Sequence, residues 1–210
     1  PVHLPLLAIV GSFLLMAGNI GWGWSNPLHA AALGGLAPIR GSVNSVLYAT
    51  GGLLIPLLYS WFVAGSSDPL MTARGLAAGA VAGLGAGPFV PPAAALTIGL
   101  LAGASVPLVT YLVDRRLRLN DSAGIVAMGF VPALLGLLAT GIWADGLLGS
   151  GWQATGIGGI LGVSGQGVSG LWVAPGFQVN FPGQLQAQMI GILALGLWGF
   201  LASLLLCGPL

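Results

Sequence analysis

The sequence predicts an all-α integral membrane protein, with six transmembrane helices in a single membrane domain that covers residues 1–210. Of the 210 residues, 56% are hydrophobic and only 4% are charged, whereas the surface of a soluble protein is typically about a quarter charged. Six apolar runs follow one another, separated by prolines, glycines or charged residues. We expect the spans at about 4–24, 42–63, 70–87, 93–113, 122–143 and 184–207. A chain of this composition needs the lipid bilayer as its solvent.

Proline is expected to end the first span and to kink the second. Residues 4–24 are about long enough to cross roughly 30 Å of hydrocarbon as a helix, and Ser25-Asn26-Pro27 ends that helix because proline lacks a backbone N–H. This run has no cationic leader and no small-residue cleavage site, so we expect it to remain as a helix. Residues 28–41 are expected to form a loop. In the second span, Asn44 is expected to make a helix–helix hydrogen bond or a cap, and Pro56 a kink.

The third span is unusually rich in small residues. Gly75, Gly79 and Gly83 recur every four residues and form two overlapping small-xxx-small pairs. This pattern lets the backbones of membrane helices approach one another closely. We therefore expect this helix to pack against other helices.

The fourth and fifth spans form a predicted helical hairpin around a basic turn. Residues 114–121 join them and contain Arg115, Arg116 and Arg118, three of the five cationic residues of the chain. Because cytoplasmic loops are enriched in Lys and Arg, we expect this turn and both termini on the cytoplasmic side, and Arg40 on the other. The turn is most simply a solvent-exposed loop whose positive charges set the orientation of the chain in the membrane. Anionic lipid head groups could bind it weakly.

A Gly-rich loop, residues 144–183, precedes the last span. It is too polar to cross a membrane, and the predicted topology places it outside. Its tryptophans, Trp152 and Trp172, fit either anchors at the membrane interface or a lid over a ligand. A loop of this length usually packs on something.

The residues give little support to an enzyme or a metal site. His3 and His29 lie at predicted membrane boundaries on opposite sides, so they cannot form one site, although either alone could bind a metal or a pigment. All four acidic residues, Asp145 among them, fall in predicted turns, which excludes a relay of carboxylates within the membrane. Residues 162–167 lack the lysine of a phosphate-binding loop, and Cys207 has no partner for an intrachain disulfide. We expect no cofactor, and contact with lipid or pigment stays open.

Seven segments carry a resemblance to a known family. They are His3-Leu4-Pro5, Gly18 to Trp24, Val43-Asn44-Ser45, Arg74 to Leu84, Ala104 to Asp121, Ala139 to Gly146 and Gly183 to Gly191. In this order and with these separations, they resemble the second half of the ammonium transporter (Amt/Rh/MEP) family, its sixth to eleventh membrane helices. The resemblance implies a trimer of eleven-helix protomers, each built from two inverted repeats and a last long helix around a narrow hydrophobic pore. The present chain would supply one half of such a protomer.

The resemblance also assigns pore positions. The family carries a pair of pore imidazoles, one from each half, and the motif of the second aligns with residues 124–133. There the histidine position is Gly129 and the aspartate position is Gly124. The family's aromatic gate aligns with Trp22, and the hydroxyl of its external cation site aligns near Asn26. A belt at the membrane interface is the plainer interpretation of Trp22.

Two functions follow as hypotheses. Without a histidine at position 129, nothing between Ser122 and Trp143 can exchange a proton near neutral pH, which favours a non-conducting structural or accessory subunit of a larger membrane complex. The alternative is a channel subunit for ammonium, ammonia or a small neutral solute that pairs with a complementary half, as the ring of Trp22 would allow. Either protein would lie in a bilayer, predicted to be a bacterial inner membrane, with further subunits as homo- or hetero-oligomeric partners. The net charge of +1 gives no reason to expect nucleic acid.

Overall fold

The computed structural model describes residues 3–25, 36–118, 121–149 and 166–208. Apart from one bridging pair, Asp145 and Ser169, the regular structure of these residues is helical. In chain order the elements are α1 (Leu4–Ser25), α2 (Leu36–Ala64), α3 (Pro69–Ala86), the short η2 (Gly87–Phe89), α4 (Pro92–Tyr111), the π-helical turns η3 (Leu112–Leu117) and η4 (Val126–Phe130), α5 (Val131–Trp143) and α6 (Gly183–Cys207).

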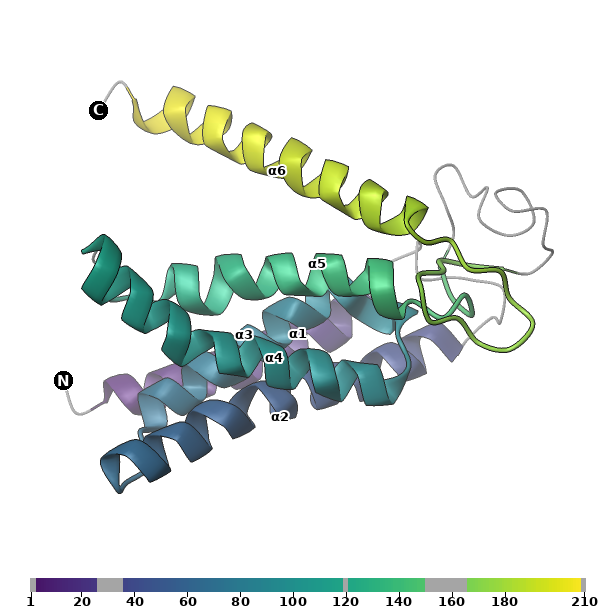
Figure 1. Cartoon of the computed structure of the whole chain (residues 1–210). Coiled ribbons are helices and arrows are strands. Elements are labelled where there is room, and N and C mark those ends of the chain that lie inside the picture. The colour runs from purple at the N-terminus through teal and green to yellow at the C-terminus, as the bar shows by residue number, and fades with distance from the viewer. Residues whose placement is uncertain (1–2, 26–35, 119–120, 150–165, 209–210) are drawn as a thin grey trace.

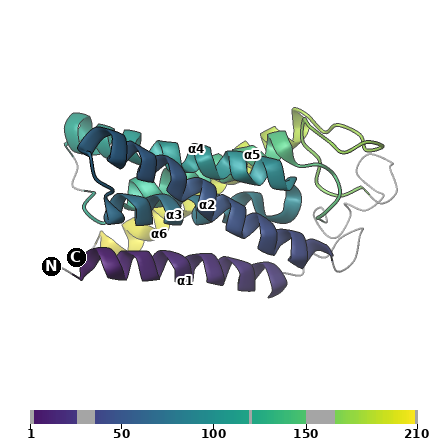
Figure 2. The ribbon, with the colours of Figure 1, turned by 90° about the horizontal axis from the view of Figure 1, so that it is seen from below.

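The long helices run back and forth along one axis (Figure 1). α3 lies at the centre and packs against α1, α2, α4 and α5. α1 runs along one side of the bundle (Figure 2). α6 contacts α5 and diverges from the bundle toward its C-terminal end. Both termini lie at one end of the molecule, and the described segment 166–182 lies at the other.

The central position of α3 confirms the expectation drawn from its small residues. Ten of its 18 residues are buried, Gly75, Gly79 and Gly83 among them. A Cβ atom added to Gly79 would overlap the carbonyl oxygen of Tyr48 on α2, and one added to Gly83 would lie 2.6 Å from the Tyr48 ring. The two helices can cross this closely only because no side chain separates their backbones.

The helix α3 also differs from the other predicted spans. Within the described residues, five helices are long and apolar enough to cross a membrane, namely Leu4–Ser25, Ala37–Ala64, Pro92–Leu117, Val126–Trp143 and Gly183–Cys207. α3 is less apolar than these five, and its crossing of the membrane stays a prediction. Glycines and Arg74 lower its mean hydropathy, and four neighbouring helices cover it, so it needs no lipid-facing apolar surface.

Two predicted helix boundaries are wrong. α2 begins at Leu36 rather than at residue 42, because Pro38 lies in the first turn, where the missing N–H has no helical partner to lose. The helix that starts with α4 continues through η3 to Leu117, so Arg115 and Arg116 lie on its last turn rather than in a linker. Arg118, with φ of 53°, adopts the left-handed conformation that ends it.

Proline and aspartate shape the remaining helices. Pro56, within α2, cannot donate to the carbonyl of Gly52, and that carbonyl faces Gly75 of α3 and Gly103 of α4. Asp68 caps α3 by accepting hydrogen bonds from the amides of Leu70 and Met71. Asp121 accepts hydrogen bonds from the first amides of η4, which begins at Val126 rather than at the predicted residue 122.

The predicted orientation can be tested by labelling cysteines from either side of the membrane. Arg116 and the native Cys207 belong to the same end of the bundle, and Val179 belongs to the other. We expect a membrane-impermeant maleimide to label Val179→Cys, in a Cys207→Ser background, from the outside of intact cells. Arg116→Cys in the same background, and Cys207 in the native chain, should react only after permeabilisation. Labelling of positions 116 and 179 from the same side would contradict the topology.

Candidate functional site

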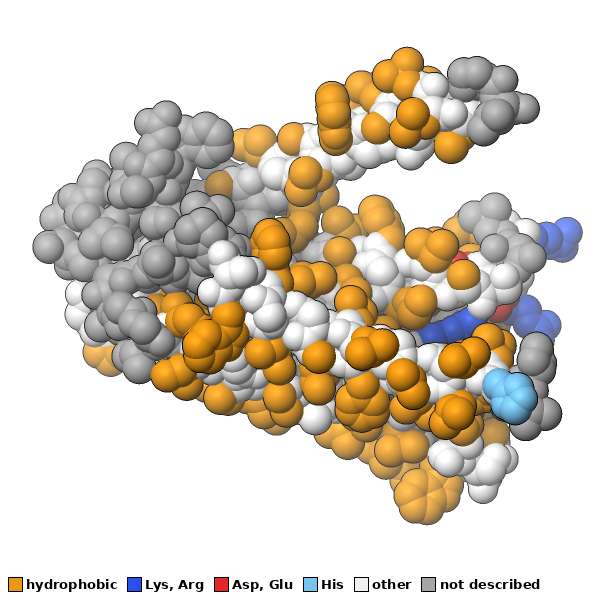
Figure 3. Space-filling view, turned by 180° about the vertical axis from the view of Figure 1, so that it is seen from behind, with side chains coloured by type: hydrophobic (Ala, Val, Ile, Leu, Met, Phe, Trp, Pro, Cys, Tyr) orange, Lys and Arg blue, Asp and Glu red, His pale blue; other side chains and the backbone are white. Residues whose placement is uncertain are grey.

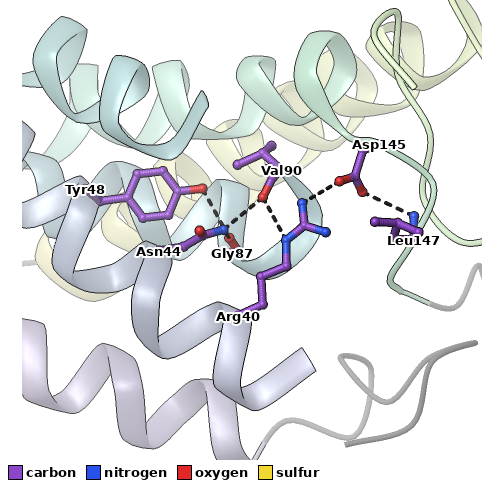
Figure 4. Close-up of polar contacts among 7 residues, drawn as sticks. All are labelled: Arg40, Asn44, Tyr48, Gly87, Val90, Asp145 and Leu147. Carbon is purple, nitrogen blue, oxygen red and sulfur yellow. Dashed lines mark hydrogen bonds and ion pairs between the residues drawn. The ribbon is translucent and has the colours of Figure 1, made fainter. Parts of the chain in front are cut away.

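A buried polar cluster occupies the end of the bundle opposite the termini (Figure 4). Arg40, in the second turn of α2, donates from Nη2 to the Asp145 carboxylate at 2.5 Å and from Nε to the Val90 carbonyl at 3.1 Å. The Arg40 side chain is 15% exposed and that of Asp145 is 7% exposed. The second carboxylate oxygen of Asp145 accepts a hydrogen bond from the amide of Leu147. The ion pair therefore joins α2 to the α3–α4 connection and to the segment after α5.

Asn44 and Tyr48 extend this cluster one and two turns along α2. The Asn44 amide donates to the carbonyls of Val90 at 2.9 Å and Gly87 at 3.3 Å, and the Tyr48 hydroxyl donates to the same Gly87 carbonyl at 3.1 Å. These carbonyls lie where η2 interrupts the chain between α3 and α4 and leaves backbone acceptors without helical partners. Asn44 was expected to make a helix–helix hydrogen bond or a cap, and it donates to the carbonyls of the C-cap residues of α3 and η2.

This cluster was not predicted from the sequence. Asp145 was predicted to lie in a turn. It does follow the end of α5, but it is also buried, paired with Arg40, and accepts a further hydrogen bond from the Leu147 amide. The separation of 105 residues between the two partners explains the omission. The one available signal was that the predicted topology placed both residues on the same side of the membrane. Arg40, Asp145 and the Tyr48 hydroxyl are each engaged within the cluster, while the side-chain oxygen of Asn44 is buried without a hydrogen-bond partner among the described residues. We assign the cluster a structural role.

The two pore positions assigned by resemblance lie around η4. Gly129 is in the π-helical turn itself, and a Cβ atom added there would meet nothing within 4 Å. Gly124 is buried at the start of this segment with φ of +72°, a conformation that residues with side chains rarely adopt. A Cβ atom at Gly124 would lie 3.0 Å from Nε of Arg74. The helix therefore carries no side chain at either position.

The aromatic residues have different environments. Trp22 is 55% exposed near the end of α1, and its neighbour Trp24 donates from Nε1 to the Ser42 hydroxyl of α2 at 2.9 Å. The exposed Trp172 lies against Trp143 of α5, with 5.5 Å between ring centroids. This contact attaches the loop to the bundle. Asn26, Trp152 and His29 lie outside the described residues.

The basic turn and His3 lie at the surface. Arg115, Arg116 and Arg118 are all exposed. His3 is exposed before the first turn of α1. Among the described residues, no group of three or more His, Cys, Asp or Glu side chains could hold a metal ion.

A bundle of long apolar helices around a glycine-rich central helix defines a polytopic membrane protein. The family model of the Ammonium Transporter Family matches residues 1–208. The chain belongs to that family, as the resemblance predicted.

Individual relatives agree with this assignment. The chain is 31% identical over 190 residues to the ammonium transporter Amt1 of Haloferax mediterranei, with 86% of this chain and 36% of the relative covered. It is 28% identical over 201 residues to a putative ammonium transporter of Synechocystis sp., with 94% of this chain and 37% of the relative covered. The crystal structure of Saccharomyces cerevisiae Mep2 superposes with a TM-score of 0.69 at 22% identity, over 91% of this chain and 39% of that chain. The chain thus spans about a third of the length of these relatives.

Proposed function

We infer that this chain is a membrane subunit that does not carry ammonium through a histidine relay, and that its role in a larger membrane complex is structural. The observation that carries the proposal is the environment of Gly129. The position that the resemblance assigns to a pore histidine holds no side chain, and the space beside it is open. A relay needs a group that exchanges protons near neutral pH at this depth. Glycine offers none.

Within the segment from Val126 to Trp143, no side chain replaces the imidazole. From Val126 to Trp143 the side chains are apolar except for Thr140. The Thr140 hydroxyl is held by the carbonyls of Gly85 and Gly136. A hydroxyl in this position is also too weak an acid and base to take part in a relay at neutral pH. The segment is thus suited to packing between helices rather than to proton transfer.

A structural role is supported by the apolar surfaces that the chain presents. No residue of α6 is buried within the chain, and Leu193, Trp198 and Leu205 are each more than 70% exposed. α1 is likewise mostly exposed. Such surfaces require lipid or further membrane helices to cover them. A homo- or hetero-oligomer is the proposed arrangement.

Family membership supports a second candidate function. The relatives named above are described as ammonium transporters, one of them as a putative one. Under this alternative the chain would form part of a pathway for ammonium, ammonia or another small neutral solute, together with a complementary half. The exposed Trp22 ring would then be available to contact a cation.

Uptake by liposomes separates the two functions. We expect the purified chain, reconstituted alone, to show no saturable methylammonium uptake above that of empty vesicles, while a known ammonium transporter reconstituted in parallel does. Gly129→His should not create uptake, because the 210 residues contain only two other histidines, of which His3 is exposed before α1. Saturable uptake by the unmodified chain would contradict the structural role and favour the channel. Uptake only after addition of a complementary chain would indicate a split transporter that works without this histidine.

A further inference from the structure

A cavity opens at the end of the bundle where the chain begins. It has a volume of about 350 Å³ and lies between the N-terminal halves of α1 and α3 and the segment that leads into α5. Its walls are mostly apolar, with Ala8 and Leu15 from α1, Ala77 from α3 and Met128 from η4. The hydroxyl of Ser12 also lines it, but donates to the carbonyls of Ala8 and Ala73. Most of this surface therefore suits a hydrocarbon chain.

One cationic group contributes to this apolar lining. Arg74 of α3 is partly buried and donates one hydrogen bond, from Nη2 to the Ser122 carbonyl at 2.6 Å. Within the described part of the chain, the pair of Arg40 and Asp145 is the only salt bridge, so no carboxylate there neutralises Arg74. Figure 3 shows a positively charged patch recessed between apolar helices at this end of the molecule, with further positive side chains projecting at the rim and acidic side chains close by.

Two acidic side chains at this end of the bundle cap helices and form no salt bridge with Arg74. Asp68 accepts hydrogen bonds from the first amides of α3, and Asp121 from the first amides of η4. The residue whose Cβ would approach the guanidinium is Gly124, which has no side chain. An unpaired guanidinium that is partly removed from water is costly. It has spare N–H donors in the fork geometry that binds phosphate or carboxylate.

We propose that this cavity binds an anionic phospholipid, whose head-group phosphate is held by Arg74 and whose acyl chain lies along Ala8, Gly11 and Met128. The ligand has to combine a negative charge with a hydrocarbon tail, because the cavity combines one unpaired cation with an apolar wall. The position agrees with that chemistry, since Arg74 lies in the second turn of α3, near the helix end. The site rests on the structural role proposed above, because its wall includes Met128, next to the position Gly129 that the resemblance assigns to the pore.

Native mass spectrometry of the full chain in detergent measures this binding. The probes are dioleoyl-phosphatidylglycerol, dioleoyl-phosphatidylcholine, dioleoylglycerol, which lacks the phosphate, and glycerol 3-phosphate, which lacks the tails. We expect phosphatidylglycerol to bind about tenfold more tightly than each of the others, a factor equivalent to about 1.4 kcal/mol. Equal binding of dioleoylglycerol would overturn the role of the charge. Equal binding of glycerol 3-phosphate would overturn the role of the cavity.

Three pairs of variants locate the site. Arg74→Gln removes the cation, and Arg116→Gln removes one from the exposed basic turn. Gly11→Leu adds a side chain at a residue that lines the cavity, and Gly18→Leu adds the same side chain two helical turns further along α1, at a residue that does not line it. At both positions an added Cβ atom would meet nothing within 4 Å. Gly124→Asp places a carboxylate beside the Arg74 guanidinium, and Gly124→Asn places an uncharged group of the same shape there. Asp and Asn both tolerate the left-handed backbone conformation.

Arg74→Gln, Gly11→Leu and Gly124→Asp should each bind phosphatidylglycerol about tenfold more weakly than their partner variants. The two variants of a pair should have the same melting temperature. Equal binding by Gly124→Asp and Gly124→Asn would overturn the proposal, as would a loss in Arg116→Gln that matches the loss in Arg74→Gln. If Arg74→Gln does not fold, the Gly11 and Gly124 pairs decide the question without it.

Discussion

Replacing Gly79 with leucine should prevent the chain from folding or cause a loss of at least about 3 kcal/mol of stability, the upper end of the usual cost of overpacking. The reason is the crossing of α2 and α3, where even a Cβ atom at this position overlaps the Tyr48 carbonyl oxygen. Backbone cannot rotate away as a side chain can, so the helices have to separate. The measurement is thermal unfolding of the detergent-solubilised chain, followed by circular dichroism.

Two comparisons give this prediction its control. Gly196→Leu adds the same side chain to α6, where a Cβ atom would meet nothing within 4 Å, and should unfold like the wild type. Gly83→Ala should cost less than Gly79→Ala, because its Cβ atom would meet the ring of Tyr48 rather than the backbone. Unchanged stability of Gly79→Leu would mean that α3 is not packed against α2 as described.

Replacing Asp145 with asparagine should destabilise the chain by about 3 kcal/mol, since removal of one partner leaves the other charge buried without compensation. Asparagine keeps an oxygen that can accept the Leu147 amide, so the loss reports mainly on the pairing with Arg40. The destabilisation should appear as a lower melting temperature in the same assay. Segment 166–182 should also become more accessible to protease, because it is attached to the backbone of residue 145. The Asp145 carbonyl accepts a hydrogen bond from the Ala174 amide, and Asp145 forms a bridge with Ser169.

A double-mutant cycle distinguishes the ion pair from a local effect. Arg40→Gln combined with Asp145→Asn should be less destabilising than the sum of the two single changes, because the double variant contains no unpaired buried charge. Asp114→Asn, at an exposed acidic residue on the last turn of the fourth span, should leave the melting temperature unchanged. Additive losses in the cycle would contradict the pairing.

The sequence by itself determined the helical membrane fold, because the signals for it are local. An apolar run of about twenty residues forms a helix in lipid whatever its neighbours are, since its backbone hydrogen bonds have to be satisfied within the segment. The four-residue repeat of Gly75, Gly79 and Gly83 predicted the packed helix in the same way. The family was also accessible, because the order and separation of short segments are properties of the chain alone. Boundaries such as the start of α2 were missed because Pro38 is equally compatible with a loop and with a first helical turn.

Only the tertiary structure decided which side chains meet. Arg40 and Asp145 are 105 residues apart, and no periodicity in the sequence links them. Likewise, the proximity of Gly124 to Arg74 and the cavity beside them depend on how α1, α3 and η4 are placed around one another. The physical reason is that helix formation in a bilayer is governed by the composition of each segment, whereas the pairing of buried charges and the shape of a cavity depend on the distances between segments. Those distances are set by the glycines at which the helices cross.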